Sequence, residues 1–164
     1  SGQGKYKIDA GSTTTIYNGA AVASNAGYII DGQTTDAPIL GVLNGIFYNA
    51  ATTLKPTFAN FYKQPITPAN SEDIDAFVFD NPQQQYVVAT DAAVAQSGYL
   101  ETYDMNTSAG DDITGKSSAT LDIGDTSADA ASFRLLRSAE DPENDENAAF
   151  RSVVVVPNLI ELQS

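Results

Sequence analysis

The sequence contains no cysteine, no histidine and no tryptophan. Without cysteine there is no disulfide framework, no thiolate nucleophile and no sulfur-ligated metal. Without histidine the chain lacks the commonest general base, the commonest metal ligand and the side chain that titrates near neutral pH. We therefore expect no enzyme, no catalytic residue, no cofactor and no metal centre.

Basic residues are also scarce: 8 Lys and Arg stand against 21 Asp and Glu, for a formal net charge of −13. A chain this acidic is repelled by phosphate backbones and by anionic membrane surfaces. No segment approaches the roughly eighteen apolar residues of a membrane span. We expect neither nucleic acid nor membrane as a partner, and the charge suits a surface that faces water.

The acids themselves offer two weak candidates for chemistry. Paired carboxylates could hydrolyse glycosides, but among 21 acids close pairs arise by chance and no pair is marked out. The loop Glu140–Asn147 could hold Ca²⁺ through oxygen ligands, as could Asp104–Ser108, but both lack the closing glutamate of an EF-hand. Solvated acidic loops are the commoner explanation, and Ca²⁺ binding at 140–147 stays open.

What the chain does have is alternation of apolar and polar residues, as in Ile74–Phe79, between frequent turn signals. Period two is typical of strands. With 164 residues, the pattern predicts one compact all-β domain, a β-barrel or sandwich-like fold. One short helix is expected at Ala92–Ser97, capped by Asp91 and ended by Gly98.

Two long apolar runs predict strands that are covered on both faces. In Asp36–Tyr48, the interior Gly41 and Gly45 indicate a bulge, a bend or the close approach of another backbone. A central strand explains this run, and so does a strand that also meets a partner, through residues such as Leu43 and Phe47. The run Val153–Val156 predicts a central strand that Pro157 ends.

The first fifteen residues differ from the rest. Glycines and two lysines precede the first acid, while Tyr6 and Ile8 alternate with Lys5 and Lys7. A disordered tail is the default, and an arm that becomes ordered on a partner is the alternative. We expect residues 1–15 to be flexible unless bound, and residues 1–14 to be removable without unfolding, with Lys5, Tyr6, Lys7 and Ile8 as partner contacts. Residues 16–164 form the single β domain.

Three segments carry a resemblance, in this order along the chain. They are Pro38-Ile-Leu-Gly-Val-Leu-Asn-Gly-Ile-Phe-Tyr48, Ile74-Asp-Ala-Phe-Val-Phe-Asp-Asn-Pro82, and Asp141-Pro-Glu-Asn144 leading into Val153-Val-Val-Val-Pro-Asn-Leu-Ile160. Together they resemble the small capsid decoration (cement, head-stabilising) proteins of tailed bacteriophages, especially aquatic phages. The resemblance implies a structural virion protein on the capsid exterior. It also implies the major capsid protein as partner, a homo-oligomer on the shell, and stabilisation by mechanical linkage without catalysis.

Two other functions remain open at this point. A receptor- or carbohydrate-binding β-domain of a tail fibre or adhesin would use aromatics such as Tyr62, Tyr99 or Tyr103 as stacking platforms. A hydrolase would use carboxylates, and its rate would follow groups that titrate near pH ~4–6.

Overall fold

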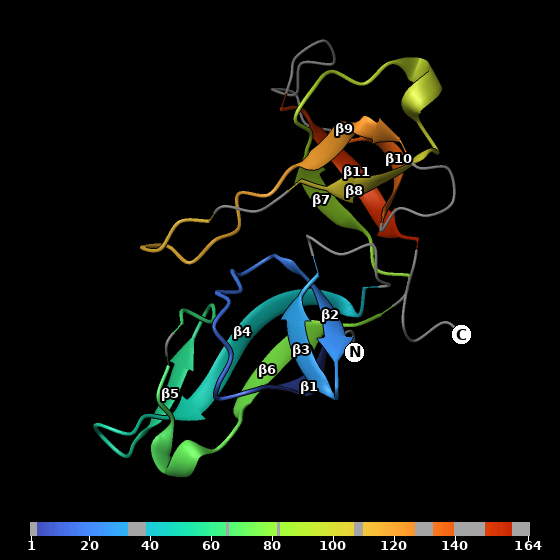
Figure 1. Cartoon of the computed structure of the whole chain (residues 1–164). Helices are drawn as coiled ribbons and strands as arrows, with labels where there is room; N and C mark the ends of the chain where they lie inside the picture. The colour runs from blue at the N-terminus through green and yellow to red at the C-terminus, as the bar shows by residue number, and fades with distance from the viewer. Residues whose placement is uncertain are drawn as a thin grey trace.

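The computed structural model describes residues 3–32, 39–64, 66–81, 83–106, 110–126, 133–139 and 150–158. Its strands form two antiparallel sheets (Figure 1), so the predicted all-β, barrel- or sandwich-like class is confirmed. The predicted helix is wrong: only a 3₁₀ turn, Gln96–Gly98, forms there. Val94 is the one buried side chain of that stretch, and a single anchor does not offset the cost of starting a helix.

The N-terminal sheet contains six strands. In chain order they are β1 (Gln3–Ile8), β2 (Ala21–Asn25), β3 (Tyr28–Asp31), β4 (Gly41–Asn49), β5 (Pro56–Ala59) and β6 (Ile74–Phe79), with a 3₁₀ turn at Ala69–Ser71. The strand order is β1-β6-β4-β2-β3, and β5 pairs with the second half of β4. The long strand β4 is therefore the backbone of this sheet.

The C-terminal sheet contains the other five strands. They are β7 (Tyr86–Ala89), β8 (Thr102–Met105), β9 (Leu121–Thr126), β10 (Phe133–Ser138) and β11 (Ser152–Pro157), in the order β7-β11-β10-β8-β9. The valine run lies in β11, between two neighbours, with Val153, Val154 and Val155 all buried. Pro157 is its last residue. The predicted central strand is confirmed.

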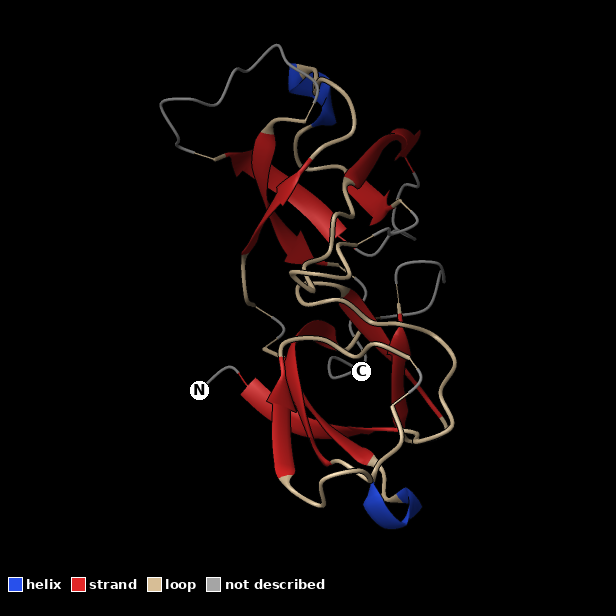
Figure 2. Ribbon diagram, turned by 90° about the vertical axis from the view of Figure 1, so that its left-hand side faces the viewer, coloured by secondary structure: helices blue, strands red, loops and turns tan. Residues whose placement is uncertain are grey.

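Each sheet has its own apolar core, and the two sheets lie one above the other in both views (Figures 1 and 2). The two cores meet at the start of β4. Leu40 packs in the core of the N-terminal sheet, and its neighbour Ile39 packs in the core of the C-terminal sheet. In the same way, Val22 belongs to the first core and its neighbour Ala21 to the second. The apolar run is thus covered on both faces at residues 39 and 40, whereas farther along Asn44 is exposed and Phe47 is only partly buried. Among the described residues no helix is long and apolar enough to cross a membrane.

Both glycines of β4 do what the sequence indicates. A Cβ on Gly41 would lie 2.0 Å from the carbonyl oxygen of Phe79, so this is a close approach of two backbones. Gly45 follows a register shift between Leu43 and Gly45 and has a φ of 153°. The second glycine therefore marks a β-bulge.

The N-terminal segment is not a free arm. Gln3–Ile8 forms β1, which pairs antiparallel with β6 over its whole length, and Ile8 is completely buried. Farther along, the Tyr62 hydroxyl donates to the Ser12 carbonyl at 2.7 Å. The expectation of a segment that orders only on a partner is corrected by this pairing. The alternation that suggested an arm belongs to a strand of the chain's own sheet.

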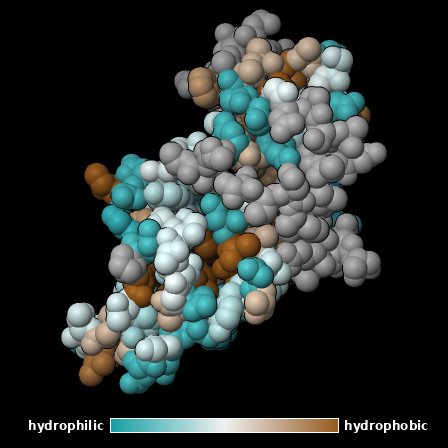
Figure 3. All heavy atoms as spheres, in the orientation of Figure 1, coloured by the Kyte–Doolittle hydropathy of each residue, from teal (hydrophilic) through white to brown (hydrophobic). Residues whose placement is uncertain are grey.

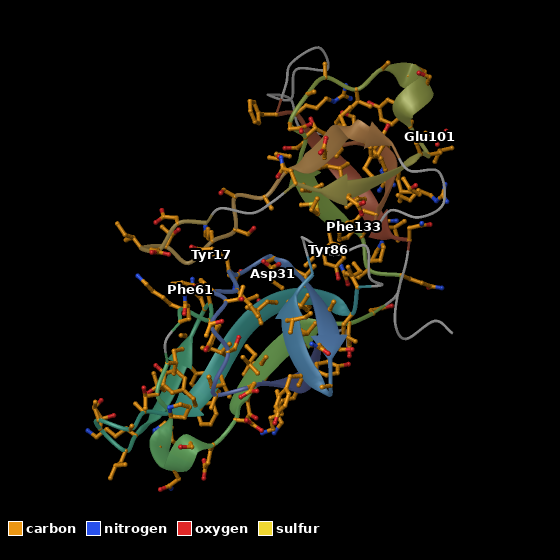
Figure 4. All side chains as sticks on the ribbon, in the orientation of Figure 1. Tyr17, Asp31, Phe61, Tyr86, Glu101 and Phe133 are labelled. Carbon is orange, nitrogen blue, oxygen red and sulfur yellow. The ribbon has the colours of Figure 1, made fainter. Side chains whose placement is uncertain are left out.

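The two sheets are also joined by a loop, Gly110–Ser117, which we call the clasp loop. It leaves the C-terminal sheet and reaches the N-terminal one, where Asn18 forms a parallel bridge to Lys116. Tyr17 and Phe61, side by side in Figure 4, stack beside the loop with ring centroids 5.6 Å apart. The Tyr17 hydroxyl donates to Asp112 at 2.8 Å, and Lys63 lies 3.3 Å from the same carboxylate.

Candidate interaction surface

The outer face of the N-terminal sheet carries three phenylalanines on three neighbouring strands. Along β6, Ile74, Ala76 and Val78 are buried in the core, which turns Phe77 to the other face. Phe47 on β4 lies directly opposite Phe58 on β5. The Phe47 and Phe58 ring centroids are 4.8 Å apart, and those of Phe58 and Phe77 are 6.4 Å apart. We call Phe47, Phe58 and Phe77 the phenylalanine face.

In the β4–β6 pairing Gly45 lies opposite Phe77, and a Cβ there would meet only the Ala59 carbonyl oxygen within 4 Å, at 3.2 Å. The rings of Phe58 and Phe77 stack on each other. Their planes are 17° apart, a stacked geometry. Phe58 is nonetheless 74% exposed. Figure 3 shows apolar residues, in brown, among polar ones on the N-terminal sheet. An aromatic cluster left this open to water indicates a contact surface.

Two lysines of β1 border the phenylalanine face. Lys5 pairs with Phe77 and Lys7 with Asp75 in the β1–β6 register. Lys7 donates a hydrogen bond to the Asp75 carboxylate, and the Lys5 ammonium lies 3.9 Å from it. The hydrogen bond to Asp75 raises the pKa of Lys7 above its ordinary value, and nearby carboxylates add to the effect. All these groups are at the surface, so the ion pairs contribute little to stability.

A hollow of about 290 Å³ adjoins the phenylalanine face at Phe47. Its lining residues are Lys7, Phe47, Tyr48, Asn49, Pro68, Glu72, Asp73 and Asp75. We call it the acidic hollow because three carboxylates in it stand against one ammonium group. The Tyr28 hydroxyl donates to Asp73 at 3.0 Å. For the Glu72 carboxylate there is no ion pair or hydrogen bond among the described residues.

The six residues expected to contact a partner separate into two groups. Lys5, Lys7 and Phe47 lie on the outer face, where Lys7 and Phe47 pair with Asp75 from opposite sides of β6. The other three, Tyr6, Ile8 and Leu43, turn to the core side. Ile8 and Leu43 are buried, and Tyr6 packs against the core while its hydroxyl donates to Asp80 at 2.6 Å. Ile8 and Leu43 therefore cannot meet a partner without unfolding the sheet, whereas Tyr6 on the edge strand β1 is only partly buried.

The sequence marks Phe58 as an exposed-looking aromatic that could stack on a sugar or belong to the core or an interface, but it did not single out Phe77 or Glu72. The signal for Phe77 was present, because in Ile74–Phe79 every second residue is small or aliphatic and the phenylalanines fall on the opposite face. The position of Phe58 opposite Phe47 could not be read from the sequence, since it depends on the pairing of β5 with β4. Pairing of this kind is a tertiary property.

The other candidate sites change with the structure. Tyr62 and Tyr103 are buried. Tyr99 contacts the buried Arg151: the guanidinium lies 5.7 Å from the centroid of the Tyr99 ring and donates a hydrogen bond to the Tyr99 hydroxyl. None of the three is an open stacking platform. The loop 140–147 lies outside the described residues, as do two residues of Asp104–Ser108. Within the described part of the chain, no three Asp or Glu residues gather as a metal site.

A cleft of about 410 Å³ lies between the two sheets. Tyr86 and Phe133 line it, and their rings meet edge to face with centroids 6.4 Å apart (Figure 4). Burial, together with the charge of Asp80, raises the pKa of Tyr86 to about 12. The Tyr86 hydroxyl donates to the Phe79 carbonyl at 3.1 Å, which joins the C-terminal sheet to β6. This cleft is part of the junction between the sheets.

Comparison with known protein families, curated proteins and solved structures found no match to this chain.

Proposed function

We propose that this chain is a structural virion protein that decorates the capsid of a tailed phage, binding the outer surface of the shell and stabilising it. The observation that carries the proposal is the phenylalanine face, an adhesive surface on a rigid sheet. Two of the three segments that resemble decoration proteins form strands of this face: Pro38–Tyr48 includes most of β4, and Ile74–Pro82 includes β6. The proposed partner is the major capsid protein, and the protein works without catalysis.

The net charge of −13 supports a position on the capsid exterior. Acidic surfaces stay hydrated and do not adhere to one another or to nucleic acid. An apolar face then provides the contact, and charge keeps the rest of the molecule in water. A ligand that binds only the assembled shell stabilises it by mass action, by about 4 kcal/mol at a concentration a thousand times Kd. Copies that associate on the lattice would add further contacts.

Phe58→Ala tests the role of the face. The shells are prepared without the decoration protein. We expect the Phe58→Ala variant to bind them about tenfold or more weakly than the wild type does. The reason is that burying a phenylalanine is worth about 1.5–3 kcal/mol. The measurement is occupancy of the shells by sedimentation, over a range of protein concentrations. Circular dichroism should be unchanged, because Phe58 is 74% exposed.

Phe150→Ala is the matched control. Phe150 is also a phenylalanine, 69% exposed, but it precedes β11 in the C-terminal sheet. Its removal should leave shell occupancy unchanged. Equal losses from both variants would show that general surface hydrophobicity, and not this face, binds the shell. Wild-type protein that does not bind shells at all would refute the proposed function.

The exposed Phe58 ring also favours a second candidate function. An open aromatic face can stack on a sugar ring, with Asn49 and Asp75 close enough to the same surface to bind hydroxyls. This would suit a receptor- or carbohydrate-binding domain of a tail fibre or adhesin. A glycan array probed with wild type and Phe58→Ala separates the two functions. Saturable sugar binding that is lost in the variant would favour the fibre domain over the decoration protein.

A further inference from the structure

The acidic hollow has a definite charge. Glu72, Asp73 and Asp75 contribute three negative charges and Lys7 one positive charge, so its lining carries a net charge of −2. Lys5 does not line the hollow, and its ammonium lies 3.9 Å from the Asp75 carboxylate. Lys7 also pairs with Asp75 and is attracted by Asp73 and Glu72. Within the described part of the chain, neither Glu72 nor Asp73 has an ion pair.

Glu72 and Asp73 are open to water and lie before β6, at the end of the sheet where Phe47 stands. A cation that enters the hollow would have Phe47 on one side and these two carboxylates on the other. An aromatic ring and a carboxylate pair are the two features that hold a guanidinium, through stacking and charge-assisted hydrogen bonds. Lysine would fit less well, because its ammonium is a hydrated point charge.

We propose that the phenylalanine face and the acidic hollow together dock a protein segment that places an apolar side chain beside an arginine. The apolar side chain covers Phe58 and Phe77, and the arginine enters the hollow beside Phe47. Charge complementarity decides the occupant. The hollow carries −2 within a protein of −13, which attracts a basic partner and repels a second copy of this acidic chain. The inference rests on the proposed function for the partner's identity, a subunit of the shell.

The chemistry is tested first with a defined probe. The probe is the dipeptide N-acetyl-Leu-Arg-amide, titrated into the full chain while the backbone amide resonances are followed by NMR. The matched probe is N-acetyl-Leu-Glu-amide. We expect the arginine dipeptide to shift amides of β4 and β6 around Phe47 and Asp75, and the glutamate dipeptide to leave them in place. Equal shifts from both probes, or shifts elsewhere in the chain, would overturn the inference.

The charge is tested with Glu72→Gln combined with Asp73→Asn, which keeps side-chain size and hydrogen-bonding capacity. We expect the Kd for the arginine dipeptide to rise about threefold to tenfold, the effect of removing two surface charges. The matched control is Glu101→Gln combined with Asp122→Asn. These acids belong to the C-terminal sheet region, and Glu101 lies far from the phenylalanine face (Figure 4). The control should leave Kd unchanged. A rise in Kd of similar size in the control would show that net charge alone causes the effect and would overturn the inference.

The same variants are then bound to shells prepared without this protein. Weaker shell occupancy by Glu72→Gln/Asp73→Asn, with the control unaffected, would support the inference. If wild type and the charge variant occupy shells equally, the inference is wrong while the proposed function stands. If wild type binds the arginine dipeptide but no shell, the proposed function fails and the docking chemistry stands. These outcomes separate the two proposals.

Discussion

At the scale of single residues, the glycines of β4 show how the absence of a side chain can be specific. Gly41 lets β4 and β6 approach so closely that a Cβ would lie 2.0 Å from the Phe79 carbonyl oxygen. Gly45 lies at the β-bulge of β4 and has a φ of 153°. One glycine allows the close packing of two strands and the other allows the bulge.

Gly41→Ala should therefore destabilise the protein, by about 1–3 kcal/mol, since the backbone of a neighbouring strand must move to admit the methyl group. Urea unfolding followed by circular dichroism measures the loss. Gly27→Ala is a useful comparison, because a Cβ there meets nothing within 4 Å and any cost comes from its φ of 88° alone. A Gly41→Ala protein as stable as the wild type would show that β4 and β6 can separate at no cost.

At the scale of secondary-structure elements, β1 is the largest departure from what the sequence suggested. It pairs with β6 along its full length and places Ile8 in the core. It also brings Lys5 and Lys7 to the border of the phenylalanine face. Glycine-rich, polar composition suggested a flexible arm, but one buried isoleucine, a half-buried tyrosine and a complete ladder of hydrogen bonds are enough to hold a short strand.

Deleting residues 1–14 should destabilise the N-terminal sheet, in contrast to the expectation from sequence. Burial of Ile8 alone is worth about 1.5–3 kcal/mol, and the deletion also leaves β6 as an open edge. Thermal unfolding should shift to lower temperature. The double variant Lys5→Ala/Lys7→Ala keeps strand β1 and removes its two charges. The melting temperature of this variant should stay close to that of the wild type. Unchanged melting of the deletion protein would mean that β1 is dispensable.

At the scale of the whole molecule, the clasp loop holds two separate cores together. Asn18 and Lys116 bridge the sheets, and Asp112 binds both Tyr17 and Lys63 from the far side of the loop. The hydrogen bond from Tyr17, reinforced by Lys63, lowers the pKa of Asp112 below its ordinary value. Hydrogen bonds from the backbone amides of Ile113 and Thr114 lower the pKa of Asp111. Ionised carboxylates therefore contribute to holding the clasp loop, alongside the backbone hydrogen bonds that join it to Asn18.

The sign of the pH dependence follows from these depressed pKa values. A carboxyl whose folded pKa lies below its unfolded pKa stabilises the fold at pH above about 3.8, and this contribution is lost as pH falls through the folded pKa. We expect acid to loosen the clasp loop before the sheets unfold. Aromatic proton resonances of Tyr17, followed from about pH 5 to pH 2, measure the change.

Asp112→Asn is the control for the acid transition. The amide still accepts from the Tyr17 hydroxyl but does not titrate, so the response of Tyr17 to acid should largely disappear. The remaining response would come from Asp111, which keeps its own bonds to the loop backbone. If Tyr17 follows the same titration in wild type and in Asp112→Asn, the carboxylate of Asp112 does not control the clasp.

The sequence by itself determined the all-β class, the alternation of most strands, the buried valine run of β11 and the special role of both β4 glycines. These follow from the local period of two and from the geometry of glycine, which need no knowledge of neighbours. Tertiary structure decided the rest. Whether Lys5 or Ile8 faces outward, which strands bring Phe58 beside Phe77, and how the clasp loop joins two cores all depend on pairing between distant segments. Pairing selects the covered face of each strand, so only the folded chain divides its residues between core and surface.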